Sequence, residues 1–396
     1  MAGPSALSHL TSGQVTELMS RYYAGERVES LLREFAISCR DTQLFQTFTA
    51  EVLDLPCPHC ESPLRRRWPS RTAAVPQTAY CSNCGHQQSP RCHCTGCRIL
   101  AHEQDRARRE RIQEIIDAYC TSVNGPTVSP ASLEDVSPVL MTVLLALVRT
   151  ADADLHGRFS AVAGANPPFA PTDNIAIAFL RLLHGAGLIW LDPSSSPEAF
   201  EVEQERVVDV RWLHASWSIP SSETDDLLTR LEYRAIDDSL PSSWLNEARR
   251  LHIIIAAAEC RNYFDRRLKE RGLPPVRTGK VEAMIYSLLI NHSVSQAFGI
   301  IWRGAQEAAD FLLRNRVPLP HASNFAIGAC QRYAEKANAE GWKLRDYRRP
   351  IDEPRSMVSH VLHDLILKVG ERGFYLPESL IWPAPLSPIS EAQPDN

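Results

Sequence analysis

Apolar residues recur three and four positions apart along most of the chain, a spacing that predicts amphipathic helices. Near the N-terminus this pattern predicts a trihelical unit over residues 10–55. Thr11 or Ser12 can cap its first helix, Gly25 ends that helix, and the third helix is expected from about Asp41 to Leu53. The residues expected to face inward are Val15, Leu18, Met19, Val28, Leu31, Leu32, Phe35, Leu44, Phe45 and Phe48.

The pattern changes in the middle of the chain. Helices expected over residues 138–149 and 173–185 are followed by β segments at 187–191, 200–202 and 207–217. A helix, a strand and a hairpin in this order resemble the last helix and wing of a winged helix. Residues 130–220 are therefore predicted to form a helical, winged-helix-like domain with some β structure, and Trp212, Trp217 and Ile219 are interpreted as core.

Residues 223–376 are predicted to form a C-terminal helical domain. Its expected helices cover 243–268, 280–290, 295–314, 323–340 and 356–369. Residues 377–396, which contain Pro, Ser and acidic residues, are predicted to be a disordered tail. The fold class that follows is mainly α and multidomain, with β structure confined to the cysteine-rich region described next and to the winged-helix-like segment.

Seven of the eleven cysteines fall between Cys57 and Cys97. Such clustering in CxxC pairs indicates metal binding rather than a disulfide framework. Cys57 and Cys60 form one pair, and Cys81 and Cys84 form a second pair twenty residues later. Because a two-residue gap lets both sulfurs of a pair reach one tetrahedral ion, the sequence predicts a structural Zn²⁺ site in a zinc ribbon over residues 56–101.

A catalytic zinc site is not expected at these cysteines. Pro56-Cys57-Pro58-His59-Cys60 matches half of the nucleobase deaminase signature, which also requires an upstream HxE. His9, followed by Leu10 and Thr11, is the only histidine before Cys57. Four thiolates would also close the coordination shell and leave no open position for water.

A second Zn²⁺ site is predicted just beyond the first. Cys92, Cys94 and Cys97 are close enough in sequence to share an ion, with His86, His93 or His102 as the fourth ligand. His86 has the most suitable reach because a loop separates it from the three cysteines. The alternatives are that some of these cysteines are free thiols, or that one of them substitutes in the first site.

The first fifty residues, in the wording QVTELMSRYYAGERVESLLREFAISCRDTQLFQTF, resemble the helix-turn-helix of resolvases and transposases. In that resemblance Leu32, Ala36, Ile37 and Phe45 occupy packing positions, although Leu32 stands where a small residue is usual and Thr42 where an apolar one is usual. The resemblance implies that the third helix reads DNA through its exposed face. The residues on that face are Arg40, Thr42, Gln43 and Gln46. The alternative is an ordinary three-helix bundle that does not touch DNA.

Arginines surround an aromatic residue inside the zinc ribbon. The residues concerned are Arg65, Arg66, Arg67, Trp68 and Arg71. Arginine next to an aromatic ring suits phosphate contact and base stacking. It also suits a protein interface, where Arg and Trp are common hot spots, and a solvated loop is the third interpretation.

The distribution of charge supports a local rather than a global affinity for nucleic acid. The net charge is −5, but Cys57 to Ile112 contains ten arginines and four acidic residues, a local balance of +6. Part of this charge lies on an Arg-rich linker helix predicted over residues 102–122, whose apolar stripe is Ile112, Ile115, Ile116 and Tyr119. No apolar run reaches the ~18–20 residues that a membrane span needs, and no secretory signal is visible. A cytoplasmic protein without a membrane partner is expected.

An enzyme is the less favoured interpretation. The sequence lacks GxxxxGK[ST], GxSxG and HExxH, although scattered residues can still build a site. The basic cluster Lys343, Arg345, Arg348, Arg349 and Arg355 is interpreted as a solvated face paired with nearby acids. His360, His363 and Asp364 have metal-compatible spacing on an expected helix, but no further partner at a recognisable distance.

The sequence therefore predicts a zinc-binding protein that binds or docks on DNA, in a regulatory, mobile-element or defence-associated role. Its helical C-terminal region is expected to serve assembly, as a homo-oligomer or with a protein partner. The first alternative is a zinc-ribbon adaptor subunit that binds another protein. The second is an enzyme whose site lies unrecognised in the helical half, for which a deep pocket lined by His321, His360, His363 or the Arg cluster would be evidence.

Overall fold

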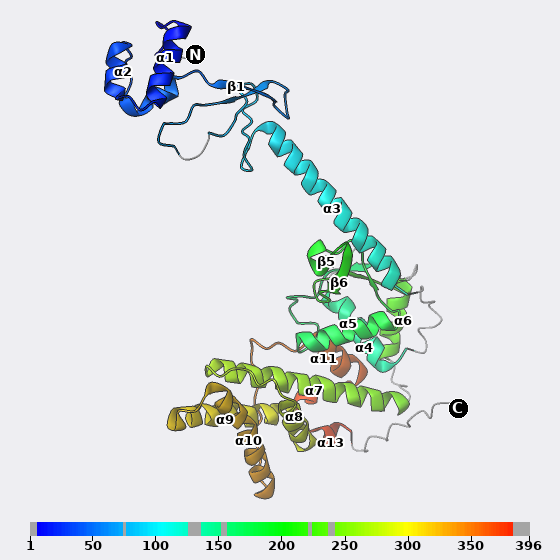
Figure 1. The fold of residues 1–396 in the computed structure, drawn as a ribbon. Helices are drawn as coiled ribbons and strands as arrows, with labels where there is room; N and C mark the ends of the chain where they lie inside the picture. The colour runs from blue at the N-terminus through cyan, green and yellow to red at the C-terminus, as the bar shows by residue number, and fades with distance from the viewer. Residues whose placement is uncertain are drawn as a thin grey trace, which may run out of the picture. The chain divides into compact units, whose positions relative to one another are not determined.

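The computed structural model describes residues 6–73, 77–125, 136–151, 157–220, 224–236 and 242–382. The chain forms two compact units, Met1–Arg111 and Ile112–Asn396, which are considered separately below (Figure 1). As predicted, the fold is mainly helical, with a small hairpin and a cysteine cluster near the N-terminus and small sheets in the middle.

The first unit begins with two short helices, α1 (Ser12–Tyr23) and α2 (Val28–Glu34). Thr11 caps α1 as expected: its side chain accepts a hydrogen bond from the Gln14 N–H, and the Gln14 side chain accepts one from the Thr11 N–H. The apolar faces of these helices meet in a core of fully or largely buried side chains. This N-terminal core consists of Leu7, Leu18, Tyr22, Leu31, Phe35, Ile37, Leu44 and Phe48.

The prediction of a third helix from Asp41 to Leu53 is wrong. Residues Asp41–Thr47 form a 3-10 helix, η1, and a β-strand, β1 (Glu51–Pro56), follows. The β-branched Thr47, Thr49 and Val52 favour extended backbone, which explains the early end of the helical turn. The packing role implied for Ala36 is also wrong, because Ala36 is exposed and adopts a left-handed φ of 50° in the turn after α2.

The region predicted as a zinc ribbon over residues 56–101 is entered through an antiparallel hairpin between β1, which precedes it, and β2 (Pro63–Arg66), in which Val52 faces Arg65. Arg65 also pairs with Tyr80, which in turn pairs with Gln87. The segment that carries the second cysteine pair is therefore joined by backbone hydrogen bonds to the segment that carries the first.

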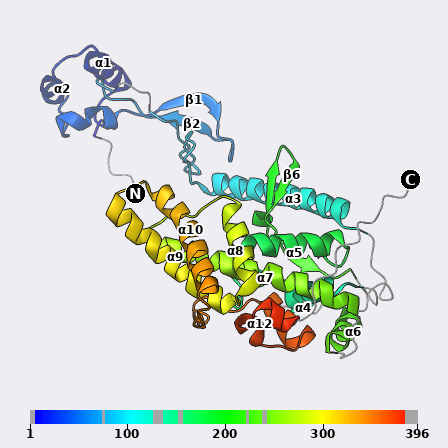
Figure 2. The ribbon, with the colours of Figure 1, turned by 90° about the horizontal axis from the view of Figure 1, so that it is seen from below.

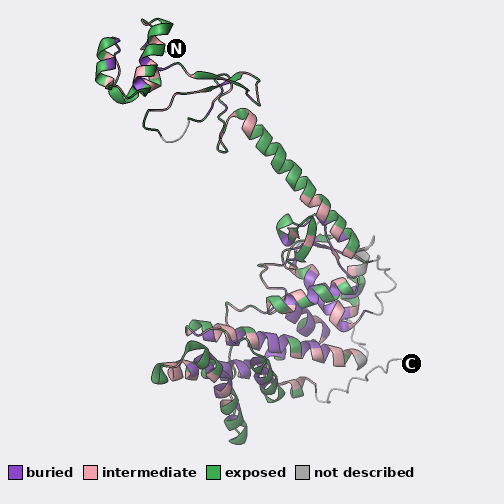
Figure 3. Ribbon diagram, viewed as in Figure 1, coloured by how far each residue is buried: buried purple, intermediate pink, exposed green. Residues whose placement is uncertain are grey.

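Helix α3 (Thr95–Val123) begins earlier than the predicted linker helix over residues 102–122. Every residue from 98 to 111 is exposed, whereas Ile116 and Cys120 are buried in the core of the second unit (Figure 3). The expected apolar stripe thus packs against a hydrophobic core only in the last three turns of the helix.

The second unit opens with the helix, strand and hairpin order that was predicted for residues 130–220. Helices α4 (Pro138–Thr150) and α5 (Asp173–Gly185) lie beside a three-stranded antiparallel sheet in the order β3-β7-β4. Its strands are β3 (Arg158–Phe159), β4 (Trp190–Leu191) and β7 (Trp217–Ser218). Between β4 and β7 the chain forms the hairpin β5–β6 (Phe200–Glu203 and Arg206–Val210), and Trp217 is fully buried.

The remaining helices form the C-terminal part of this unit. They are α6 (Thr224–Ile236), α7 (Ser242–Glu270), α8 (Lys280–Asn291), α9 (Val294–Asn315), α10 (Leu319–Ala339), α11 (Met357–His360), α12 (Arg372–Tyr375) and α13 (Glu378–Ile381), with a π-helical turn, η4 (Val361–Ile366), after α11. Helices α9 and α10 pack side by side and α9 also packs on α7 (Figures 1 and 2). Ser293 caps α9: its side chain accepts a hydrogen bond from the Gln296 N–H.

Helix α7 joins two hydrophobic cores. Its first half contributes Leu251 and Ile255 to the core around α4, α5 and the small sheet, and its second half contributes Phe264 and Leu268 to the core around α8, α9 and α10. The predicted tail over residues 377–396 is wrong in its first residues, because Glu378 opens α13 and pairs with Arg249. The rest of that tail, residues 383–396, lies outside the described residues.

Candidate metal centre

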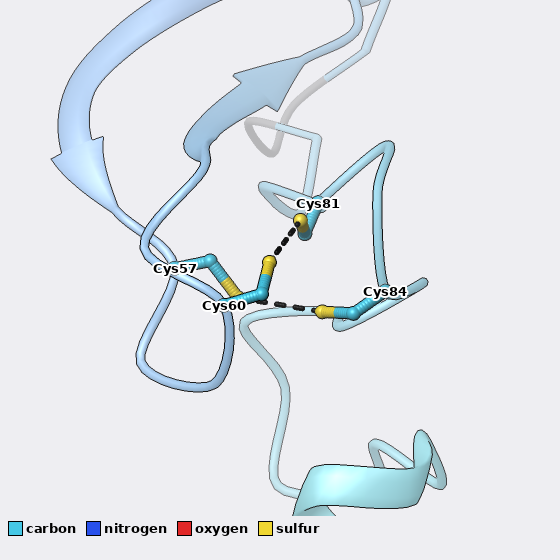
Figure 4. A group of neighbouring side chains, drawn as sticks. All are labelled: Cys57, Cys60, Cys81 and Cys84. Carbon is cyan, nitrogen blue, oxygen red and sulfur yellow. Dashed lines mark hydrogen bonds between the residues drawn. The ribbon is translucent and has the colours of Figure 1, made fainter.

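The four cysteines of the two CxxC pairs lie together at one end of the β1–β2 hairpin (Figure 4). The sulfur of Cys57 lies 3.5 Å from that of Cys84, and the sulfur of Cys60 lies 3.4 Å from that of Cys81. Sulfurs that surround one zinc ion at 2.3 Å are separated by about 3.8 Å, whereas a disulfide would hold them at about 2.05 Å. The predicted four-cysteine cluster is therefore present, and its geometry fits zinc.

The two pairs form knuckles with the same backbone hydrogen bonds. In the first, the Cys57 N–H donates to the Ser62 carbonyl at 2.8 Å and the Glu61 N–H to the Cys57 carbonyl at 2.9 Å. In the second, the Cys81 N–H donates to the His86 carbonyl at 2.7 Å and the Gly85 N–H to the Cys81 carbonyl at 3.1 Å.

The residue after the second cysteine of each knuckle has a left-handed φ, 61° at Glu61 and 71° at Gly85. Glycine adopts this conformation at little cost, which explains Gly85. The equivalent turn is made by a residue with a side chain at Glu61, so the two knuckles share a backbone path despite different sequences.

Hydrogen bonds to sulfur favour the thiolate form that a metal requires. Ser62 donates to Cys60 from its hydroxyl and its N–H, and these bonds lower the pKa of that thiol to about 6. The N–H groups of Gln87 and Cys94 likewise lower the pKa of Cys92 to about 7. These hydrogen bonds therefore favour the thiolate form of Cys60 and of Cys92.

A second group of donors lies beside the first. Its members are His59, His86, Cys94 and Cys97, whose donor atoms all lie within 4.8 Å of one another. His86 Nδ1 is 3.7 Å from the Cys94 sulfur and 3.4 Å from the Cys97 sulfur, and His59 Nε2 is 3.2 Å from the Cys97 sulfur. Donors at Zn–N and Zn–S bond lengths of about 2.0–2.3 Å are expected roughly 3.4–3.8 Å apart, so this group also fits a tetrahedral ion.

The structure places three of the four predicted ligands of the second site, His86, Cys94 and Cys97, in one group of donors, and it adds one that the spacing of the sequence did not predict. Cys92 lies 3.5 Å from His86 Nδ1, so it also faces the cluster. His93 and His102 are exposed, and neither belongs to a group of donors that could hold a metal among the residues described. His59 is the additional donor. It lies in the two-residue gap between Cys57 and Cys60, and such a gap residue is not expected to bind a metal itself.

Of the residues predicted to bind nucleic acid, those on η1 are exposed as expected. Thr42, Gln43 and Gln46 face solvent, although on a 3-10 helix rather than on an α-helix, and Arg40, the residue before η1, is exposed as well. Arg65 and Arg67 are also exposed and share one side of β2 and its continuation. Arg66 is half-buried, and its Nε has no hydrogen-bond partner among the described residues.

Trp68 and Arg71 do not form an open stacking surface. The Trp68 ring packs on the N-terminal core, and its N–H donates to the Thr49 carbonyl at 2.9 Å. The Arg71 guanidinium donates to the Glu26 carbonyl at 2.6 Å and lies over the Tyr22 ring. These two residues join the zinc-ribbon region to the helices that precede it.

The other clusters singled out in the sequence are internal to the second unit. Arg349 pairs with Glu259 at 2.9 Å and Arg355 with Asp364 at 2.9 Å, so two members of the basic cluster are paired with acids. His360 pairs with Asp364, whereas His363 is buried against His252. Among the residues that the structure describes, these histidines belong to no group suited to a metal ion.

The second unit also contains a cavity of about 1020 Å³ between the two cores, beside the second half of α7. Arg349 from the basic cluster lines it, together with Glu259, Arg266 and Glu353, but His321, His360 and His363 do not. The ion pairs of Arg266 with Asp352 and Glu353 occupy much of its charged lining. A cavity lined by one member of the Arg cluster is therefore present, which is one of the observations that the enzyme alternative expects.

No protein-family model matches this chain, and neither a curated protein nor a solved structure matches it. None of the helices that the structure describes is long and apolar enough to cross a membrane.

Proposed function

We propose that the protein binds zinc and docks on DNA through the exposed arginines of its first unit, while the helical second unit serves assembly. The observation that carries this proposal is the exposure of Arg65 and Arg67 beside the four-cysteine cluster. Neither side chain forms an ion pair within the part of the chain that the structure describes. The Arg67 guanidinium lies over the Tyr80 ring, 5.4 Å from its centroid, a contact that leaves its N–H groups free to meet phosphate oxygens.

The charge of the region supports the same proposal. The balance of +6 between Cys57 and Ile112 falls to about +4 when four thiolates hold one Zn²⁺ and two thiolates with two neutral histidines hold another. The exposed Arg40, which immediately precedes η1, adds to this basic surface. Because η1 is a short 3-10 turn, the proposed contact is to the phosphate backbone more than to base edges.

The second unit is a poorer DNA surface. The exposed hairpin β5–β6, which was interpreted from the sequence as the wing of a winged helix, carries four acidic residues, Glu201, Glu203, Glu205 and Asp209, against the single basic Arg206. Such a hairpin would repel phosphate. Assembly, with itself or with a protein partner, is the role proposed for this unit.

Fluorescence anisotropy of the zinc-loaded full chain on a mixed-sequence duplex, measured across a salt series, tests the proposal. Binding should weaken steeply with salt. The double variant Arg65→Ala/Arg67→Ala should bind more weakly, and its salt slope should be shallower by about one unit for each phosphate that the protein no longer neutralises. The matched control is Arg303→Ala/Arg314→Ala, which removes two exposed arginines from α9. Equal binding by all three proteins would exclude docking through Arg65 and Arg67, and no binding by the wild type near 50 mM salt would exclude DNA docking altogether.

One observation favours the adaptor alternative. Strand β1 pairs only with β2 among the described strands, and its outer residues Val52 and Leu55 are 58% and 50% exposed. An exposed strand edge with apolar side chains suits a partner that adds a further strand. If the full chain ignores DNA, the same protein with Val52→Glu should lose a copurifying partner that the Glu51→Lys control retains.

A further inference from the structure

Both histidines of the second group of donors are carried by the knuckles of the first site. His59 is the residue before Cys60 in the first knuckle. His86 follows Gly85 in the second, where its carbonyl accepts the Cys81 N–H and its own N–H donates to the Cys84 sulfur. The backbone that orients these imidazoles is therefore the backbone that folds around the first four cysteines.

The two cysteines of the second group come from a different element. Cys94 stands at the N-terminus of α3, where its sulfur accepts the Cys97 N–H at 3.4 Å and its carbonyl accepts the Arg98 N–H. This is the position of an N-cap, and the positive end of the helix favours a thiolate there. Unlike the histidines, these sulfurs do not depend on the knuckles for their placement.

The contact between the knuckle and the helix requires a residue without a side chain. A Cβ atom added to Gly96 would lie 2.4 Å from Cγ and 2.6 Å from Nδ1 of His59. The His59 ring is also held by the edge of the His86 ring, with centroids 4.9 Å apart. The ring is thus fixed with its Nε2 toward Cys97 by packing as well as by the sulfur contact.

With Cys92, which lies 3.5 Å from His86 Nδ1, the second group has five candidate donors, one more than tetrahedral zinc binds. Two sets of four donors include His86, Cys94 and Cys97: one is completed by His59 and the other by Cys92. The two sets differ in the net charge of the filled site. The four-cysteine site carries a charge of about −2 with its ion, and a neighbour with two cysteines and two histidines is neutral, whereas one that includes Cys92 as a third thiolate carries about −1. Two adjacent anionic sites repel each other, which favours His59 over Cys92.

We propose that His59, His86, Cys94 and Cys97 bind a second Zn²⁺ ion, and that this site forms only after the first is filled. The inference rests on the assignment of zinc to Cys57, Cys60, Cys81 and Cys84, and it does not depend on DNA binding. Loss of the first ion releases both knuckles and with them two ligands of the second. Loss of the second ion leaves the first knuckles intact.

Metal counting on the full chain, reconstituted under reducing conditions and measured by inductively coupled plasma mass spectrometry, tests this order. The wild type should hold two ions, and Cys97→Ser and His59→Asn one each. Cys81→Ser should hold none, and Cys39→Ser, which lies outside both groups of donors, should hold two. One ion on the wild type, or one ion retained by Cys81→Ser, would overturn the proposal.

Because Cys81→Ser can lose metal simply by unfolding, a milder variant is needed. Gly96→Ala keeps every donor but displaces the His59 ring, so it should weaken the second ion at least tenfold in a Co²⁺ titration and leave the four-thiolate absorption of the first unchanged. Gly13→Ala is the matched control, since a Cβ there meets no atom within 4 Å. If Cys92→Ser rather than His59→Asn removes the second ion, Cys92 is the fourth ligand and the proposed set is wrong.

Discussion

His59 Nε2 lies 3.2 Å from the sulfur of Cys97, although 38 positions separate the two residues. The contact joins the first knuckle to the start of α3, and Gly96 provides the space for it. The zinc-ribbon region and the helix that leaves it are thereby connected through metal-ligating side chains rather than through a hydrophobic core. Several properties of the protein should follow from this connection and from the packing around it.

Metal removal should unfold the zinc-ribbon region and spare the second unit. Among the described residues of this region, the buried apolar cluster consists of Cys57, Leu64, Ala79 and Cys81, and two of these belong to the four-cysteine cluster. So small a core cannot compensate for the entropy of ordering without an ion. Hydrogen exchange measured with and without a chelator should show loss of protection over residues 51–97. Helices α7 to α10, which have their own cores, should keep theirs; loss of protection there would contradict the expectation.

Leu44→Ala should destabilise the N-terminal core by about 2–4 kcal/mol, because the Leu44 side chain is fully buried on η1. The neighbouring Gln43→Ala removes an exposed side chain and should change stability by less than about 0.5 kcal/mol. Urea unfolding, monitored by hydrogen exchange of residues 12–48, distinguishes the two variants. Similar losses in both variants would mean that η1 does not hold this core.

Trp68→Ala should cost the first unit about 1–2 kcal/mol, since the half-buried ring leaves the N-terminal core and the Thr49 carbonyl loses its donor. Trp68→Phe retains most of the packing and isolates the hydrogen bond, so its cost should be about half as large. Neither change should reduce DNA affinity of the folded protein as much as Arg65→Ala/Arg67→Ala. A larger loss of affinity for Trp68→Ala would show that the ring stacks on bases after all.

The second unit should lose stability as the pH falls from about 7 to 5. The His363 Nδ1–H donates to the Ser359 carbonyl at 2.8 Å, so its Nε2 is free to accept the His252 Nδ1–H, also at 2.8 Å. Burial lowers the pKa of His252 to about 4 and holds that of His363 well below its usual value. Both rings are therefore neutral in the folded protein, whereas an unfolded chain takes up protons near pH 6.5.

The direction of the pH dependence follows from this difference in pKa between the folded and the unfolded protein. A histidine with a depressed pKa contributes stability above pH 6.5 and loses it as the pH falls toward the folded value, by about 2 kcal/mol between pH 7 and 5 for His252. Urea unfolding at the two pH values measures the loss. His252→Gln, which can still bond to His363 without titrating, should flatten the dependence, and an unchanged slope would exclude these rings as its source.

Regular spacing made the cysteines and many helices readable from the sequence. The CxxC pairs identify themselves because both sulfurs of a pair must reach one ion, and helices such as α8 and α9 follow from apolar periodicity and a cap at Ser293. The prediction of a third helix failed because helical spacing of Leu44, Phe45 and Phe48 also fits a 3-10 turn that ends in a strand. The pairing of β1 with β2, which decides this, lies outside the local pattern.

The sequence by itself determined the CxxC pairs of the four-cysteine cluster and the mainly helical fold. Both the reach of a CxxC pair and the apolar face of a helix depend on residues within a few positions of one another. Only the tertiary structure decided that His59 faces Cys97, that Trp68 and Arg71 are used in internal packing, and that Arg65 and Arg67 remain exposed. The physical reason is that each of these outcomes depends on contacts between residues far apart in the chain. A histidine between two cysteines has the same local sequence whether its ring meets solvent or a second ion, and the backbone turn at Glu61 together with the space above Gly96 makes the difference.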